Sequence, residues 1–267
     1  MSHEVGRIIN KEFEMEYLKF GEGEKTLVII PGLSVQSVIP LGSAIEKQYS
    51  VFKDDFTVYL FDRRKNLPPA YSVSDMADDT AKAIKELGLS DVCLFGTSQG
   101  GMILMILAAR CPELVARLAL GSTACRETEE IRNAVCEWIS FAEKGEREKL
   151  YLSFGEKLYS PETFSAFRET LIKMSETVED NDLKRFIILA NALYGLDFRE
   201  SLRKISCPVL ALNDESDKVL GADAASEIAK QMKNNECFES YIYSGFGHAV
   251  YDTAPDFTSR LYDFFTK

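Results

Sequence analysis

The sequence predicts an α/β fold with a mostly parallel central sheet, flanked by helices and interrupted by an inserted helical cap. Short apolar runs rich in β-branched residues alternate with segments of helical period. These runs are apolar at nearly every position, which is typical of strands buried on both faces. Over residues 124–204 the apolar residues keep a helical spacing and no strand is visible. We therefore expect residues 1–123 and 205–267 to form the core and residues 124–204 to form the cap.

The elements of the core follow from these patterns in order. Alternating residues before a Gly-rich turn predict an antiparallel edge hairpin within the first 25 residues. The other expected strands are residues 26–30, 56–61, 91–95, 115–120, 208–212 and 238–243, and the expected helices are residues 74–87, 99–110, 222–232 and 255 to the end. Ser74 is the expected N-cap of the first of these helices, Gly88 ends it, and Pro112 follows the second.

The cap is expected to roof a pocket, and its apolar positions are the candidates for lining it. Most of these side chains are expected to pack helix against sheet instead. The aromatic candidates are Trp138, Phe141, Phe164, Phe167 and Tyr194.

Composition excludes several classes of function. The chain has 267 residues, of which 46% are hydrophobic and 27% charged, as in ordinary globular domains. Its net charge of −11 repels phosphate backbones and anionic lipids, so we expect no nucleic-acid partner and no membrane partner. The first residues resemble no secretory signal and no apolar window has the length of a membrane span, so we expect a cytoplasmic protein. The oligomeric state is not readable from the sequence.

Six cysteines occur, at positions 93, 111, 125, 136, 207 and 237, and none forms a C-x-x-C pair. We expect reduced, structural thiols, and a disulfide or a metal site is the alternative. Because no cluster of histidine and cysteine ligands is visible, neither a metal nor another cofactor is predicted.

The sharpest motif is Gly96-Thr97-Ser98-Gln99-Gly100, between an expected strand and an expected helix. In a G-x-S-x-G turn at this place, side chains two residues before and after the serine would clash, so glycines are required there. The turn strains the serine and lifts its hydroxyl above the sheet. Ser98 is therefore the candidate nucleophile, and a Gly-rich turn with an N-capping serine is the alternative.

A serine hydroxyl needs a base, and the chain has only two histidines. His3 lies in the N-terminal segment. His248 follows the last expected strand, at the end where open α/β sheets place their ligands. The candidate base is therefore His248, and a surface histidine is the alternative.

The imidazole needs a carboxylate that holds its tautomer. Three acids compete in the loop after residues 208–212, namely Asp214, Glu215 and Asp217. Asp217 is favoured because it lies far enough past the strand to curl back toward His248. Asp214 and Glu215 remain open.

Two backbone N–H groups are expected to stabilise an oxyanion. One belongs to Gln99, directly after the candidate nucleophile. The other is assigned to Leu33, in the loop after the first buried parallel strand. Leu33 is assigned because Gly32 permits an unusual backbone direction, and a plain Pro-Gly turn is the alternative.

With these motifs the chain resembles the α/β-hydrolase superfamily over nearly its whole length, and above all its serine-nucleophile members with a helical cap. The resemblance rests on the elbow at residues 96–100, the acid loop around Asp217 and the pair Gly247-His248. It implies the α/β-hydrolase fold. The serine at position 98 argues against the dehalogenases and epoxide hydrolases of the superfamily, which carry an aspartate there.

The chain also departs from the usual pattern of this superfamily. Pro31-Gly32 stands where His-Gly is usual, residues 62–69 replace a Gly-rich segment, and Asn213 replaces a glycine. These departures concern the oxyanion loop and the substrate class, and they leave the three candidate side chains unchanged.

We expect a serine hydrolase that acts on a small, partly hydrophobic ester or related carbonyl compound through Ser98, His248, Asp217 and an acyl-enzyme. One alternative is a non-catalytic ligand-binding receptor that keeps the fold. The other is a lyase or carbon–carbon bond hydrolase that uses the same three side chains.

Overall fold

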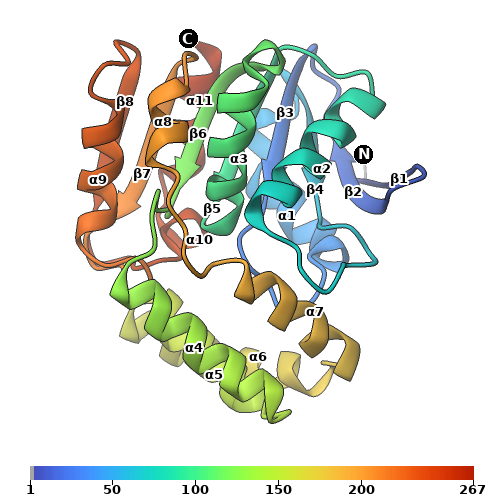
Figure 1. Cartoon of the computed structure of the whole chain (residues 1–267), viewed down its shortest axis with the longest axis vertical. Coiled ribbons are helices and arrows are strands. Elements are labelled where there is room, and N and C mark those ends of the chain that lie inside the picture. Colours follow the sequence, from blue (N-terminus) through green and yellow to red (C-terminus); the bar gives the residue numbers. More distant parts are fainter. Residues whose placement is uncertain (1–2) are drawn as a thin grey trace.

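A computed structural model describes residues 3–267, and its centre is an eight-stranded sheet with the strand order β1-β2-β4-β3-β5-β6-β7-β8 (Figure 1). The edge hairpin is antiparallel and joins β4 in antiparallel fashion, while all pairs from β4 to β8 are parallel. The predicted, mostly parallel sheet is thus confirmed. The strands are β1 (Glu4–Ile9), β2 (Glu14–Phe20), β3 (Lys25–Ile30), β4 (Phe56–Phe61), β5 (Val92–Thr97), β6 (Val115–Gly121), β7 (Val209–Asp214) and β8 (Phe238–Tyr243).

Helices cover both faces of the sheet. None of the helices in the described range is long and apolar enough to cross a membrane. The α-helices are α1 (Gly42–Gln48), α2 (Val73–Glu86), α3 (Gln99–Arg110), α4 (Glu129–Glu143), α5 (Arg147–Leu158), α6 (Pro161–Glu176), α7 (Asp180–Asn191), α8 (Arg199–Lys204), α9 (Asp223–Met232), α10 (Val250–Thr253) and α11 (Phe257–Thr266), with short 3-10 helices at Ile39–Leu41, Ser50–Phe52 and Pro112–Leu114.

The sheet separates two apolar layers, because successive side chains of a strand point to opposite faces. Val28 and Ile30 of β3 belong to the layer that contains side chains of α2, α3, α8 and α9. Leu27 and Ile29 belong to the opposite layer, with side chains of α11. β5 pairs with β3 in the middle of the sheet, and every one of its residues is buried. Burial on both faces explains why the sequence of this central strand is almost continuously apolar.

Helices α4 to α7 lie beyond the carboxyl ends of the parallel strands, at the bottom of Figure 1. α4 packs against α5 and α7, and α5 packs against α6. α8 also falls within the predicted cap, but it packs against α3 and α9 beside the sheet. The division of the chain into a core and a cap stays a prediction.

Three local features differ from the prediction. The N-cap of α2 is Ser72 and not Ser74, because Ser72 and Asp75 form a capping box in which each side chain accepts the other's backbone N–H. The last helix begins at Phe257, and the short α10 precedes it. Helix α1 was not predicted, since its seven residues carry no capping side chain.

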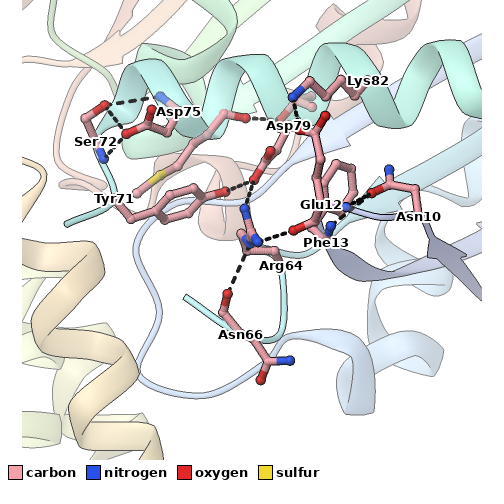
Figure 2. A network of polar contacts seen from close by, with 12 residues as sticks. Asn10, Glu12, Phe13, Arg64, Asn66, Tyr71, Ser72, Asp75, Asp79 and Lys82 are labelled. Carbon is pink, nitrogen blue, oxygen red and sulfur yellow. Dashed lines mark hydrogen bonds and ion pairs between the residues drawn. The ribbon is translucent and has the colours of Figure 1, made fainter. Parts of the chain in front are cut away.

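Arg64, shortly after β4, ties the edge hairpin to α2 (Figure 2). Its guanidinium donates to the backbone carbonyl oxygens of Glu12 and Asn66 and lies 3.5 Å from a carboxylate oxygen of Asp79 on α2. The hydroxyl of Tyr71 donates to the same Asp79 oxygen over 2.7 Å. One side chain thereby connects three segments that are distant in sequence.

All six cysteines are free. Burial raises the pKa of three thiols, to about 11 for Cys93 and Cys207 and to about 12 for Cys125. These three are therefore protonated at neutral pH. Cys136 on α4 and Cys237 before β8 are exposed.

Candidate active site

Ser98 occupies a sharp turn between β5 and α3. Its backbone angles are φ 51° and ψ −120°, in a region that residues other than glycine rarely adopt. A Cβ atom on Gly100 would lie 2.1 Å from the carbonyl oxygen of Ile30, and one on Gly96 would lie 2.6 Å from the carbonyl of Gly100. The two glycines are therefore required by contact with backbone, as the G-x-S-x-G spacing predicts.

Replacing Gly100 by alanine is expected to lower the free energy of unfolding by about 3 kcal/mol, because backbone atoms must move to admit the methyl group. Gly88 is the matched control, since a Cβ there meets nothing within 4 Å and only its φ of 67° is unfavourable. Gly88→Ala should cost about 1 to 2 kcal/mol. Denaturant unfolding measures both, and equal losses would contradict this explanation of the turn.

His248 lies in the loop between β8 and α10, where Gly245 and Gly247 adopt positive φ. Its Nδ1 is 2.8 Å from Oδ2 of Asp217, and both residues are buried, with 3% and 6% of their surface exposed. The other carboxylate oxygen of Asp217 accepts the N–H groups of Val219 and Leu220 over 2.8 and 2.9 Å. An Nδ1–H that donates to this fixed carboxylate leaves Nε2 free to accept a proton.

The two competing acids of this loop serve other contacts. Asp214 accepts the N–H of Ser216 over 2.7 Å and that of Phe246 over 3.0 Å. Glu215 accepts the hydroxyl of Ser244 over 2.6 Å. Of the three candidate acids, Asp217 is the one that the structure places against His248.

Ser98 and His248 line one small chamber of about 30 Å³. Its roof includes Trp138 of α4 and Phe154 of α5. Among residues 3–267, no hydrogen bond joins the Ser98 hydroxyl to His248. The two side chains are brought together by lining the same chamber. His3, in contrast, contacts Glu46 outside this chamber.

The loop after β3 closes one side of the chamber. A Cβ on Gly32 would lie 3.1 Å from Cβ of Ser98, which brings the adjacent Leu33 to the chamber wall. The φ of Gly32 is not positive, and its close approach to Ser98 explains the glycine at this position. Gln99 is the first residue of α3, so its N–H has no partner within the helix. The structure thus brings the Leu33 and Gln99 segments together at Ser98.

A wide groove of about 560 Å³ adjoins the chamber. It runs between the loop that follows β3 and helices α5 and α6, and most of its lining is apolar. The groove and the chamber share Leu33, Phe154 and Leu158. These three side chains form the boundary between the two spaces.

The residues that line these spaces were only partly predicted. Of the five aromatic candidates, Trp138 lines the chamber, and the other four line neither the chamber nor the groove. Phe167, for example, is 47% exposed and stacks on Tyr159. Phe154 and Leu158 were missed, although their separation by four residues on α5 is the spacing of one helix face.

Within residues 3–267, no group of three or more histidine, cysteine, aspartate or glutamate side chains is placed to hold a metal ion. The polar side chains of the chamber, Ser98 and His248 above all, are suited to proton transfer and nucleophilic attack.

Comparison with known proteins places this geometry in a family. A putative carbamate hydrolase RutD from Serratia proteamaculans is 26% identical over 246 residues, which cover 85% of this chain and 86% of the relative. The human serine hydrolase BPHL is 24% identical over 232 residues, covering 83% of this chain and 73% of the relative.

Solved structures share the fold. An α/β hydrolase from a Medee basin deep-sea metagenome superposes with a TM-score of 0.86 at 18% identity, covering 98% of each chain. An esterase from Exiguobacterium antarcticum superposes with a TM-score of 0.80 at 19% identity, covering 100% of each chain. The family model of the α/β hydrolase fold matches residues 25–255. The chain therefore belongs to the α/β-hydrolase fold family and is an enzyme of that family.

Proposed function

We propose that this protein is a serine hydrolase that cleaves small, partly hydrophobic esters or related carbonyl compounds through an acyl-enzyme. The observation that carries the proposal is the buried contact of 2.8 Å between His248 and Asp217, on the wall of the chamber that also holds Ser98. The two relatives described above, a serine hydrolase and a putative carbamate hydrolase, support the same reaction class.

In this mechanism Nε2 of His248 removes the hydroxyl proton of Ser98 as the oxygen attacks the substrate carbonyl. Asp217 stabilises the resulting imidazolium, and its own orientation is held by two backbone N–H groups. The imidazolium then protonates the leaving alcohol, which departs and leaves an ester on Ser98. Water, activated in turn by His248, hydrolyses this ester and releases the acid.

The negative charge that forms on the carbonyl oxygen needs donors that are in place beforehand. We assign this role to the N–H groups of Leu33 and Gln99. The close approach of Gly32 to Ser98, and the position of Gln99 at the start of α3, support the assignment. The positive end of the α3 dipole adds to the stabilisation.

The volumes of the chamber and the groove indicate which part of a substrate each of them can hold. The chamber at Ser98 holds a group of very few atoms, whereas the groove of about 560 Å³ has the volume of a typical ligand site. We therefore expect a substrate with one small side and one larger apolar side.

We also place the reaction in the cytoplasm, since six free thiols suit a reducing compartment.

A fluorophosphonate probe, which reacts only with an activated serine, tests the proposal. Labelling of Ser98 together with turnover of short-chain esters, thioesters or carbamates is the expected result. A protein that binds such compounds without labelling is a receptor, and the proposal then fails. Labelling with turnover of a cyanohydrin or a diketone, but of no ester, would instead identify a lyase or carbon–carbon bond hydrolase.

Filling the groove is expected to change selectivity. Met174 lines the groove and not the chamber, so Met174→Trp should lower kcat/KM about tenfold for esters with a large apolar group and leave a minimal ester such as vinyl acetate unaffected. Glu169→Trp is the control, because Glu169 is an exposed residue of the same helix that lies about 140° around its axis from Met174 and does not line the groove. Enlarging the acyl side and the alcohol side in separate series tells which one occupies the groove. Equal losses for small and large esters would rule out this division.

A further inference from the structure

A buried polar cluster lies beside the chamber, at the carboxyl end of β4. Arg63, only 6% exposed, donates from Nη2 to the carbonyl oxygen of Pro31 over 2.8 Å and to Oε1 of Gln99 over 3.3 Å. Asp62 pairs with Arg185 of α7 over 2.8 Å. The amide of Gln99, fully buried, donates to the carbonyl oxygen of Leu189, also on α7. The cluster therefore joins β4, the loop after β3, the start of α3 and α7.

The cluster carries an excess of positive charge. Two guanidinium groups, of Arg63 and Arg185, face the single carboxylate of Asp62. Nε of Arg63 and Nη1 of Arg185 are buried without a hydrogen-bond partner among the described residues. Burial lowers the pKa of Arg63 to about 10, which leaves it charged at neutral pH. Burying a charged guanidinium costs desolvation free energy. A charged Arg63 in the interior therefore points to a functional role in addition to a structural one.

The two acceptors of Arg63 are informative. Pro31 precedes Gly32 and Leu33, so its carbonyl belongs to the loop that carries one proposed oxyanion donor. Gln99 carries the other proposed donor on its own backbone. A single nitrogen, Nη2 of Arg63, is thus hydrogen-bonded to both segments, and because its two N–H groups are fixed in the guanidinium plane, it holds the relative position of the segments.

We propose that Arg63 is a positioning residue that holds the Leu33 and Gln99 segments at the spacing an oxyanion requires. The proposal rests on the proposed hydrolase function. Arg63 touches neither the chamber nor the groove, so it acts through these two segments. Its uncompensated charge also favours negative charge nearby, because the interior screens poorly.

The experiment compares Arg63→Gln and Arg63→Lys with the wild-type protein, using active-site titration to count functional serines. Per titrated site, Arg63→Gln should lower kcat about 30- to 100-fold, with KM changed less than about threefold, because the oxyanion forms only in the transition state. The affinity for a trifluoromethyl ketone should fall by a similar factor, whereas that for the product alcohol stays the same. Arg63→Lys keeps the charge but not the fixed directions of the two N–H groups on Nη2, so its kcat should lie between those of Arg63→Gln and the wild-type protein.

Arg64→Gln is the matched control. Arg64 is the adjacent arginine, and its three polar contacts bind the edge hairpin to α2 (Figure 2). Its loss should lower the melting temperature and leave kcat per titrated site unchanged.

A double variant tests the route of the effect. Gln99→Met removes the side-chain acceptor and keeps the backbone N–H, so it should reproduce part of the Arg63→Gln loss, and the two losses should not add. Unchanged kcat per site in Arg63→Gln, with only fewer titratable sites or a lower melting temperature, would show a purely structural role and overturn the proposal. Full additivity with Gln99→Met would overturn it as well. A wild-type protein without turnover or labelling overturns the proposed function, and the role of Arg63 with it.

Discussion

Ser98→Ala is expected to lower kcat for ester hydrolysis by on the order of 10⁶-fold, because no acyl-enzyme can form without the hydroxyl. The melting temperature should change little, since the strain at φ 51° is set by the turn and is present with either residue. Steady-state kinetics with p-nitrophenyl acetate and thermal unfolding measure the two quantities.

Three further variants make the result specific. His248→Ala should cause a loss of similar size, and the double variant should lose no more than either single one, because the two groups act in the same step. His3→Ala is the control, since His3 contacts Glu46 outside the chamber. If Ser98→Ala retained wild-type rates, or if the His3 variant lost activity as His248→Ala does, the assignment of nucleophile and base would be wrong.

Asp217→Asn is expected to lower kcat by about 10⁴-fold. An amide NH₂ in place of Oδ2 cannot accept the Nδ1 proton of His248, so the imidazole is held in the wrong tautomer. The remaining oxygen still accepts the N–H groups of Val219 and Leu220, which preserves the loop. Fluorophosphonate labelling should slow in parallel with kcat.

Asp214→Asn is the matched comparison three residues away. Asp214 accepts two backbone N–H groups and does not contact His248, so the variant should lose about 1 to 2 kcal/mol of unfolding free energy and keep kcat within a few-fold. The reverse order of the two effects on kcat would move the orienting acid to Asp214.

The core and the elbow were predictable because each depends on local chemistry. Gly96 and Gly100 are dictated by clashes within a turn of five residues, and the apolar run that becomes β5 is dictated by burial on both faces. The position of Asp217 was favoured by its distance from the strand, which is again a local argument. Such features leave a direct imprint on residue type and spacing.

The lining of the chamber and the cluster at Arg63 were not predictable, since both depend on how distant elements pack. The order of residues does not show that Arg63 contacts Pro31 and Gln99, or that Phe154 rather than Phe167 lines the same chamber as Ser98. The prediction of Ser74 as the N-cap of α2 was wrong for a local reason. Ser72 and Ser74 both fit a cap, and the reciprocal bond with Asp75 decides between them.

The placement of the thiols has a practical consequence. Alkylating dyes react with exposed thiolates, so Cys136 and Cys237 are the natural attachment points, once the half-buried Cys111 is replaced. One of them rides on α4 and the other precedes the outermost strand, β8. A donor and an acceptor fluorophore at these two positions would report, by energy transfer, any movement of α4 relative to the sheet during catalysis.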